Sequence, residues 1–386
     1  MSGSFSELDR RFMERALTLA ALGRYSTHPN PRVGCVVVQG EQIVGEGWHR
    51  KSGEPHAEPL ALRAAGSAAR GSTVYVTLEP HCYHSRTPPC TQALIDAGVS
   101  RVVCATLDPN PQVHGAGMRQ LEQAGIRSET GLLEDAAREL NPGFEKRMRT
   151  GLPRVIVKIG ASLDGRVALA NGESRWITGE AARADVQKLR AEVSAVLTGI
   201  DTVLADDPQL TVRDSSLDTL GRQPLRVVLD SALRMPAGAR MLKERGETLV
   251  FTASQSAADA LRGSGAKVVS LSRGDDERVD LPSVLRELGV LKCNDVLVES
   301  GPTLAGRFLD AGLVDELIVY MAPVVLGPDA RPMLQLPRLE RLADRLQFDL
   351  LRSERIGTDL KLVLRPQTRT HIQDSYEAEF DRRNPR

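Results

Sequence analysis

The sequence predicts an α/β protein of two domains. Its 386 residues exceed what one hydrophobic core usually organises, so the length favours two domains. Short apolar segments typical of buried strands alternate with amphipathic segments typical of helices, which predicts sheets covered by helices. After a polar stretch the alternation restarts with an apolar run at Val155–Ile159. We therefore expect the domain boundary between about Arg147 and Leu152.

The first half contains five strand-like segments among helical patterns. A helix is expected from about Phe5 to Leu22, because apolar and small residues recur there with a period near four. Residues 26–38 should form a loop that leads into a strand, and residues 39–49 should form a turn and a second strand. Helices are expected at 54–66, 90–98 and 118–126, with strands at 72–80 and 101–108 and a further short strand after the last helix. Gly98 is suited to close the middle helix.

The second half repeats this style without an internal sequence repeat. Strands are expected at 155–159, 195–199, 225–230, 247–253, 267–271, 295–301 and 315–327. Helices are expected between them at 179–193, 256–265, 281–290 and 302–312. The strand-like runs are short and flanked by turn residues, as the strands of a buried sheet are.

Charge and cysteine usage exclude several classes of protein. Fifty basic and fifty acidic side chains cancel, so no large field would draw the chain to nucleic acid or an anionic membrane. No run of 18 apolar residues occurs, and charges interrupt the N-terminal stretch, so we expect a cytoplasmic protein. Five irregularly spaced cysteines argue against a disulfide framework. Cys35 and Cys104 lie in apolar runs and are best explained by core packing.

A zinc-site pattern stands in the first half. His56 and Glu58 open one predicted helix, and Cys90 opens another after two prolines. This is the arrangement of zinc nucleobase deaminases, in which a histidine and two thiolates leave the fourth position of the metal open to water. The carboxylate is not a ligand but transfers the proton of that water, which makes Glu58 the candidate catalytic residue. Either short motif alone is common and mostly structural, whereas the two in order are fairly specific.

The second half contains a candidate phosphate-binding junction. The strand at 295–301 ends at Gly301, and Pro302 starts the next helix, so unpaired N–H groups should face outward there. Such junctions are frequently structural only. No G-x-G-x-x-G motif occurs in a strand-helix-strand setting, which disfavours a classical dinucleotide-binding fold. Arg190 and Arg213 suit a sugar phosphate, although a surface ion pair would explain either one equally well.

Five segments carry a resemblance to a known family: "HPNPRVGCVVV", "GEPHAEPLALRAAG", "VTLEPHCYHSRTPPC", "LDPNP" and "GASLDGRVA". On these motifs the chain resembles, from about Phe12 to Arg365, the bifunctional pyrimidine deaminases and reductases of riboflavin biosynthesis. The resemblance implies a cytidine-deaminase-like three-layer α/β domain over residues 1–148. It also implies a dihydrofolate-reductase-like α/β domain over 152–366, followed by a tail at 367–386 that we expect to be mobile.

The resemblance also implies the reactions. The first domain would use zinc to deaminate a 2,5-diamino-6-ribosylamino-pyrimidinone 5′-phosphate to the corresponding uracil. The second would use NADPH to reduce the ribosyl group to ribityl, and the choice of NADPH over NADH rests on the resemblance alone. The implied partners are small pyrimidine substrates, with neither nucleic acid nor a membrane, and the enzyme would be a homo-oligomer.

The family pattern reads E-P-C-S-H-H-G-R-T-P-P-C and places a zinc-ligand cysteine at position 81, where this sequence has His81 followed by Cys82. His81 would ligate zinc directly, Cys82 would reach the metal after a loop shift, or the site would be lost. We favour His81 with His56 and Cys90, because imidazole is a natural zinc ligand and no backbone rearrangement is needed. The resemblance further implies that Asn30 contacts the pyrimidine, and that His49 and the loop from His84 to Arg86 help to define the pocket.

In the second half every residue type that the family pattern requires is present. The implied cofactor-binding residues are Gly160, Trp176, Thr202, Asp206, Ser231, Gly301, Pro302, Thr303, Leu304, Ala305, Gly306 and Arg307. The implied substrate-binding residues are Lys158, Ser174, Arg190, Leu210, Arg213 and Glu299. Lys158 is also the nearest candidate for a proton donor.

Two alternative functions remain at this point. A reductase with an inactive deaminase-like domain would explain the histidine at position 81. A nucleic-acid deaminase would share the His-Ala-Glu motif, but its typical signature has two residues between the ligand cysteines. Here eight residues separate position 81 from Cys90, and no basic cluster with interleaved aromatics occurs.

Overall fold

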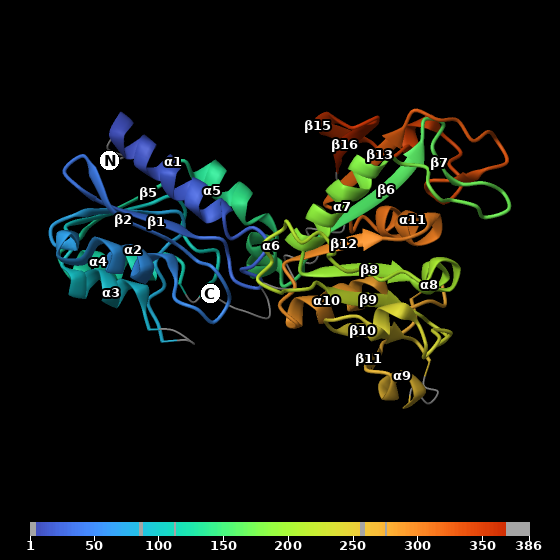
Figure 1. Ribbon diagram of the computed structural model, residues 1–386, viewed down its shortest axis with the longest axis horizontal. Helices are drawn as coiled ribbons and strands as arrows, with labels where there is room; N and C mark the ends of the chain where they lie inside the picture. Colours follow the sequence, from blue (N-terminus) through green and yellow to red (C-terminus); the bar gives the residue numbers. More distant parts are fainter. Residues whose placement is uncertain (1–4, 85–87, 112, 255–258, 275, 368–386) are drawn as a thin grey trace. The chain divides into compact units, whose positions relative to one another are not determined.

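The computed structural model describes residues 5–84, 88–111, 113–254, 259–274 and 276–367. The chain forms two units that divide between Thr150 and Gly151, and each is described by itself below (Figure 1). The expected tail lies outside the described residues from position 368 onward. None of the described helices is long and apolar enough to cross a membrane.

The first unit is a five-stranded sheet between two helical layers. The strands follow the order β2-β1-β3-β4-β5, with β1 antiparallel to both neighbours and β3, β4 and β5 parallel. Helices α1 and α5 pack on one face, and α2, α3 and α4 pack on the other (Figure 1). The elements are α1 (Glu7–Ala21), β1 (Gly34–Gln39), β2 (Gln42–Trp48), α2 (Ala57–Ala65), β3 (Thr73–Val76), α3 (Cys90–Ala97), β4 (Arg101–Cys104), α4 (Ala116–Gln123), β5 (Arg127–Thr130), α5 (Glu134–Leu140) and α6 (Pro142–Thr150), with a 3-10 turn at Gly66–Ala69.

Helix α2 is held close to the sheet by a glycine. A Cβ atom at Gly47 in β2 would lie 2.5 Å from the carbonyl oxygen of Ala57 and 2.6 Å from the amide nitrogen of Ala61. Only a residue without a side chain permits this approach. Ala57, Ala61 and Ala65 form the buried stripe that contacts the sheet. The start of α2 is thereby fixed at one edge of the first unit, where its first residues serve the site.

A buried carboxylate connects α1 to the sheet. Asp9 is 6% exposed and accepts hydrogen bonds from Tyr75 Oη at 2.7 Å and from Arg101 Nη1 at 2.6 Å. It also forms a reciprocal cap with Ser6 at the start of the helix. Burial raises the pKa of this carboxyl, but the hydrogen bond from Arg101 and those from Tyr75 and Ser6 outweigh burial and leave the pKa well below its usual range.

We expect Asp9→Asn to lower the free energy of unfolding of the first unit by about 1–3 kcal/mol at pH 7, because the buried donors lose a charged acceptor. A depressed pKa stabilises the folded state above the unfolded-state value near 3.9, and this stability is lost as pH falls through the folded-state value. Stability of the variant should therefore fall less below pH 4 than that of the wild type. Urea unfolding between pH 7 and pH 3 measures this. Glu7→Gln, at an exposed position of the same helical turn, is the control, and equal behaviour of both variants would contradict the prediction.

The second unit is a nine-stranded sheet with helices on both faces. Its strand order is β11-β10-β9-β8-β12-β6-β13-β16-β15, and the strands from β11 to β13 are parallel. The helices are α7 (Glu180–Glu192), α8 (Ile200–Asp206), α9 (Asp259–Gly263), α10 (Leu281–Val290) and α11 (Pro302–Asp310), with 3-10 turns at Arg240–Lys243 and Leu342–Asp344. The nine strands of this sheet are β6 (Arg154–Ser162), β8 (Ala195–Gly199), β9 (Leu225–Leu229), β10 (Thr248–Thr252), β11 (Ala266–Ser270), β12 (Asp295–Glu299), β13 (Glu316–Ala322), β15 (Phe348–Ile356) and β16 (Asp359–Pro366). Strands β7 (Arg166–Ala168) and β14 (Arg331–Pro332) form a separate two-stranded sheet.

Both faces of this sheet carry a buried core. Helices α10 and α11 cover one face with residues such as Leu285 and Phe308, whereas α7 and α8 cover the other with residues such as Val186 and Val203. Because β6, β8, β9 and β12 are parallel, their carboxyl ends meet at one edge of the sheet. Ligands of open α/β sheets bind at that edge.

The sequence did not predict several elements. The hairpin of β15 and β16 was missed because β15, "FDLLRSERI", is an edge strand that is largely exposed and shows no alternation of apolar residues. Helices α5 and α6 were missed because they are short and highly charged. The helix expected at 256–265 is described only as Asp259–Gly263, since positions 255–258 lie outside the described residues.

Candidate active sites

Three potential metal ligands converge at one edge of the first unit. His56 is the N-cap of α2, Cys90 is the first residue of α3, and His81 lies in the segment after β3. Cys90 Sγ lies 3.1 Å from His81 Nδ1 and 3.4 Å from His56 Nδ1. One ligand atom of each residue lies within 4.8 Å of the others. His81 follows His56 by 25 positions and precedes Cys90 by nine. The starts of two helices and one loop therefore bring the three side chains together.

This donor set fits zinc. Tetrahedral zinc with usual Zn–N and Zn–S bonds separates its ligand atoms by roughly 3.5 Å, close to the two distances to Cys90 Sγ. Two imidazoles and one thiolate leave a fourth position for water or substrate. Cys82 is half-buried and does not belong to this group of ligand atoms. The arrangement therefore favours His81 over Cys82 as the third ligand.

Glu58 lies beside the three ligands without being one of them. It occupies the first turn of α2 and is 3% exposed. Its Oε2 atom is buried and has no hydrogen-bond partner among the described residues. Burial raises the pKa of Glu58 to about 7, although its hydrogen bond with Cys90 opposes this. A buried carboxyl with one unused oxygen is suited to carry a proton between two partners.

Asn30 and His49 form a connected pair beside this centre. His49 Nδ1 lies 3.2 Å from the carbonyl oxygen of Pro55, so Nδ1–H donates and Nε2 accepts from Asn30 Nδ2 at 3.1 Å. Ser52 Oγ donates to Asn30 Oδ1 at 3.4 Å, which fixes the orientation of the amide. The His49 ring contacts the ring of His56 edge to face, with centroids 5.1 Å apart. His84 is exposed, and Arg86 lies outside the described residues.

Glu79 was not predicted but holds the loop that carries His81. Its carboxylate is 3% exposed. It accepts hydrogen bonds from the backbone N–H groups of Asp108 at 3.1 Å, Gly115 at 2.8 Å and Gly117 at 2.9 Å. The side chain thus ties the end of the strand segment to the start of α4. These partners lie about thirty or more positions away, so only the folded chain reveals this role.

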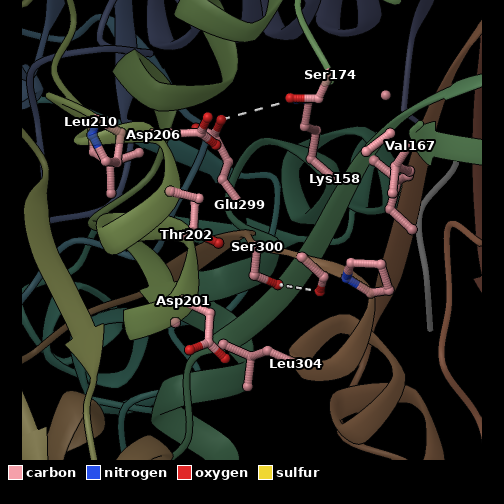
Figure 2. Close-up of a pocket in the computed structure, with 18 of the residues that line it drawn as sticks. Lys158, Val167, Ser174, Asp201, Thr202, Asp206, Leu210, Glu299, Ser300 and Leu304 are labelled. Carbon is pink, nitrogen blue, oxygen red and sulfur yellow. Dashed lines mark hydrogen bonds and ion pairs between the residues drawn. The ribbon is translucent and has the colours of Figure 1, made fainter. Parts of the chain in front are cut away.

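A large pocket lies at the carboxyl ends of the second unit's parallel strands. Its volume is about 1240 Å³, enough for two ligands. Lys158, Ser174 and Glu299 gather at one end of the pocket, with Asp201 and Leu304 at the opposite end (Figure 2). Of the predicted cofactor and substrate residues of this half, all but Ala305 and Gly306 line the pocket. Ala305 is buried, and a Cβ at Gly306 would lie 1.9 Å from the carbonyl oxygen of Gln335, so both serve packing.

A charged cluster occupies the first end of this pocket. Glu299 Oε1 and Oε2 accept from Arg190 Nε at 2.6 Å and Nη2 at 3.0 Å, and Lys158 Nζ lies 4.0 Å from Oε2. Burial and the charge of Arg190 lower the pKa of Lys158, while Glu299 opposes them. Burial raises the pKa of Glu299, but Arg190, Lys158 and Arg213 outweigh it and lower the pKa. The cluster therefore carries excess positive charge, which suits a phosphorylated substrate.

The start of α11 forms a cradle for a further anion. Gly301 is its N-cap without a side-chain cap, and a Cβ there would contact nothing within 4 Å. Open N–H groups at a helix start favour phosphate oxygens. Gln335 stabilises this turn by two hydrogen bonds. Its backbone N–H donates to Pro302 O at 3.1 Å, and its side-chain Oε1 accepts from Thr303 Oγ1 at 2.8 Å. This geometry fits the diphosphate of a nicotinamide dinucleotide.

Trp176 is 70% exposed at the rim of the same pocket. The guanidinium of Arg183 lies 4.5 Å from its ring centroid, and that of Arg175 lies 5.9 Å away. An exposed indole with two cations close to its ring offers a flat surface to a planar ligand. Neither arginine was predicted, because spacing in the sequence does not indicate which cation reaches an aromatic ring.

The fold and these two sites define a two-domain enzyme that joins a zinc deaminase to a reductase. Comparison with known proteins agrees with this class. Residues 6–106 match the model of the cytidine and deoxycytidylate deaminase zinc-binding region, and residues 153–362 match that of the RibD C-terminal domain. Riboflavin biosynthesis protein RibD of Escherichia coli is 51% identical over 92% of this chain and 99% of its own length. The Haemophilus influenzae protein of the same name is 47% identical over 94% and 98%.

The chain belongs to the RibD family of riboflavin biosynthesis proteins. Acinetobacter baumannii RibD superposes with a TM-score of 0.89 at 46% identity, covering 94% of this chain and 99% of that one. A Thermotoga maritima structure described as a diaminohydroxyphosphoribosylaminopyrimidine deaminase and 5-amino-6-(5-phosphoribosylamino)uracil reductase gives 0.82 at 33% identity, with 93% and 99% covered. Membership confirms the predicted fold class, the bifunctional deaminase and reductase function in riboflavin biosynthesis, and the cofactors zinc and NADPH.

Proposed function

We propose that the first unit deaminates the diaminopyrimidinone ribosylamino phosphate to the uracil, and that the second unit reduces the ribosyl group of that product to ribityl. The observation that carries the first step is the group of His56, His81 and Cys90 beside the buried Glu58. The name of the Thermotoga maritima structure describes the same pair of activities. The replacement of the expected cysteine by histidine then changes the donor set without abolishing it.

In the first step His56, His81 and Cys90 hold the metal. Bound zinc would act as a Lewis acid that makes water acidic enough to ionise near neutral pH. Glu58 accepts the proton of the attacking water at its unpartnered Oε2 atom and delivers it to the departing ammonia. Asn30, oriented by His49 and Ser52, positions the pyrimidine beside this carboxyl. Glu58 alone is sufficient for both proton transfers, because it first accepts the proton from water and then donates it to the leaving ammonia.

In the second step the ribose ring opens at its C1′–O4′ bond to give an imine, and bound NADPH would supply the hydride that reduces this imine at C1′. Arg190 is engaged by Glu299 and by the carbonyl oxygen of Thr211, so we infer that Arg213 is the main phosphate ligand. Burial lowers the pKa of Arg213, and the nearby Arg190 and Arg240 lower it further. A phosphate dianion would relieve this repulsion. Lys158, held near Glu299 and with a lowered pKa, is the group that we propose as proton donor to the nitrogen of this imine.

Zinc analysis of three variants tests the ligand assignment. We expect His81→Ala to lose zinc and ammonia release, because only two protein ligands remain, whereas Cys82→Ala should retain both. His81→Cys restores the residue of the family pattern and should again bind zinc. Metal content is measured by atomic emission, and ammonia release is measured with the diamino substrate. Loss of zinc in Cys82→Ala but not in His81→Ala would assign Cys82 instead.

The histidine at position 81 also supports a second candidate function, a reductase with an inactive deaminase unit. Incubating the wild-type chain with NADPH and either the diamino or the deaminated substrate separates the two candidates. Ammonia release together with NADPH consumption supports the bifunctional enzyme. NADPH consumption with the deaminated substrate alone would show that the first unit is inactive.

We further propose a cytoplasmic homo-oligomer that acts only on small molecules. Its five described cysteines are free, as in a reducing compartment. Association through the second unit is supported by Leu350 and Leu351 on the edge strand β15, which are 59% and 45% exposed. Light scattering of the full chain tests the oligomer.

A further inference from the structure

The far end of the reductase pocket carries a second group of cations. Arg278 and Arg307 both line the pocket. Burial lowers the pKa of Arg307, the charge of Asp276 raises it, and the charge of Arg278 lowers it further. Arg307 Nε lies 2.7 Å from Asp276 Oδ2, and its Nη2 donates to Val279 O at 3.2 Å. Arg307 is thus paired, whereas the exposed Arg278 guanidinium forms no hydrogen bond or ion pair within the described part of the chain.

This corner is built from three elements that meet at Val279. Its N–H donates to Ser231 Oγ at 3.0 Å, just beyond β9, and its carbonyl oxygen accepts from Arg307 on the second turn of α11. The position of Arg278 beside α11 is therefore fixed by neighbours on both sides. Within the described part of the chain this guanidinium has no counter-ion, and it lines the pocket, which is the arrangement expected for an anion site.

The geometry of the pocket decides which anion would reach this corner. Glu299 and Lys158 hold the substrate at the end of β12 and β6, and Ser231 lies two strands away, at the end of β9. Strands are spaced about 4.8 Å apart, so the corner stands roughly 10 Å from the substrate cluster along the sheet edge. The cradle at Gly301 lies between them, since Leu304 of α11 is next to the end of β8, where its Cδ2 would lie 3.3 Å from a Cβ added to Gly199. A dinucleotide with its nicotinamide at the substrate and its diphosphate on α11 would place its adenosine over β8 and β9.

We propose that Arg278 binds the 2′-phosphate of the adenosine ribose and so selects NADPH over NADH, with Arg307 as a paired positioning residue and Ser231 beside it. The proposal rests on the reductase function and adds a residue that the family motifs do not indicate. An arginine near the ribose is the usual means of accommodating a 2′-phosphate. Asp276 already neutralises Arg307, so Arg278 supplies the charge that the additional phosphate requires.

The test measures binding of NADPH, NADH and adenosine 2′,5′-bisphosphate to the full chain. Arg278→Ala should weaken NADPH and the bisphosphate by about ten- to a hundredfold, the value of a charge-assisted hydrogen bond, and lower the preference for NADPH over NADH by the same factor. Arg278→Lys keeps the charge without the planar fork and should recover part of the loss. Arg273→Ala is the matched control, because this arginine is in the same loop, pairs with Glu277 and is not among the pocket residues.

Three outcomes decide the proposal. A selective loss of NADPH and bisphosphate binding in Arg278→Ala supports it. Unchanged binding, or equal weakening of NADPH and NADH, would overturn it, because the 2′-phosphate would then lie elsewhere or Arg278 would act on the shared part of the cofactor. Failure of the wild-type chain to bind NADPH would instead contradict the reductase function, so the two failures are distinguishable.

Discussion

Glu58→Gln is expected to lower kcat for ammonia release by about 10²- to 10⁴-fold while zinc content and reductase activity stay at wild-type levels. Glutamine fills the same volume but cannot carry a proton from water to the leaving group. The buried Oε2 atom of Glu58 has no partner among the described residues, so the substitution breaks no hydrogen bond there. Ammonia release and NADPH oxidation are followed separately, and zinc is measured on the same sample.

The control is Glu54→Gln, which removes an exposed carboxylate four positions earlier and should leave ammonia release unchanged. If Glu58→Gln kept wild-type ammonia release, another group would be the proton carrier. If it lost zinc, the carboxylate would contribute to holding the metal. Because the reductase belongs to the other unit, its activity reports that the second unit remains folded, and the retained zinc reports on the first unit.

Glu299→Ala is expected to abolish the reductase and to lower the free energy of unfolding of the second unit by about 3–5 kcal/mol, because it leaves buried cations without their counter-ion. Arg190 and Lys158 would then face each other with side-chain exposures of 11% and 21%. Glu299→Gln keeps the shape and one acceptor, and should fall between the wild type and the alanine variant. Denaturant unfolding gives the stability, and NADPH oxidation with the deaminated substrate gives the activity.

The control for this variant is Glu316→Ala. Glu316 Oε2 pairs with Arg154 Nη2 at 2.6 Å at the opposite ends of the strands, away from the pocket. Because Asp295 still lies 3.4 Å from Arg154, the loss of stability should be smaller. At a temperature where both variants are folded, Glu316→Ala should keep reductase activity and Glu299→Ala should not. Equal activity of the two variants would show that Glu299 is needed for stability only.

Local motifs explain why much of each site was predictable. His56, Glu58 and Cys90 stand at helix starts, which proline, turn residues and apolar periodicity mark in the sequence. Gly301 follows an apolar strand and precedes a proline, so its position as an N-cap was predictable as well. These signals are short in range, because helix caps and buried strands depend on neighbouring residues.

The tertiary contacts were not predictable in the same way. Glu79 receives backbone N–H groups from residues 108–117, and Arg190 turns to Glu299 at a separation of 109 positions. Gln335 and Arg278 lie in loops whose composition carries no signal for a cofactor. Ala305 and Gly306 belong to the helix that forms the cradle but face packing partners, because a helix turns its successive side chains in different directions.

The sequence by itself determined the two α/β units, the zinc-deaminase motif and the unusual histidine at position 81, since each depends on residue type and short spacing. Only the tertiary structure decided that His81, and not Cys82, lies with His56 and Cys90, because the folded loop determines which of two neighbouring side chains joins the group of ligand atoms. It also decided that Arg190 pairs with Glu299, and that Arg278 lines the pocket without a counter-ion among the described residues. Charge pairing depends on distances in space, which a linear sequence does not contain.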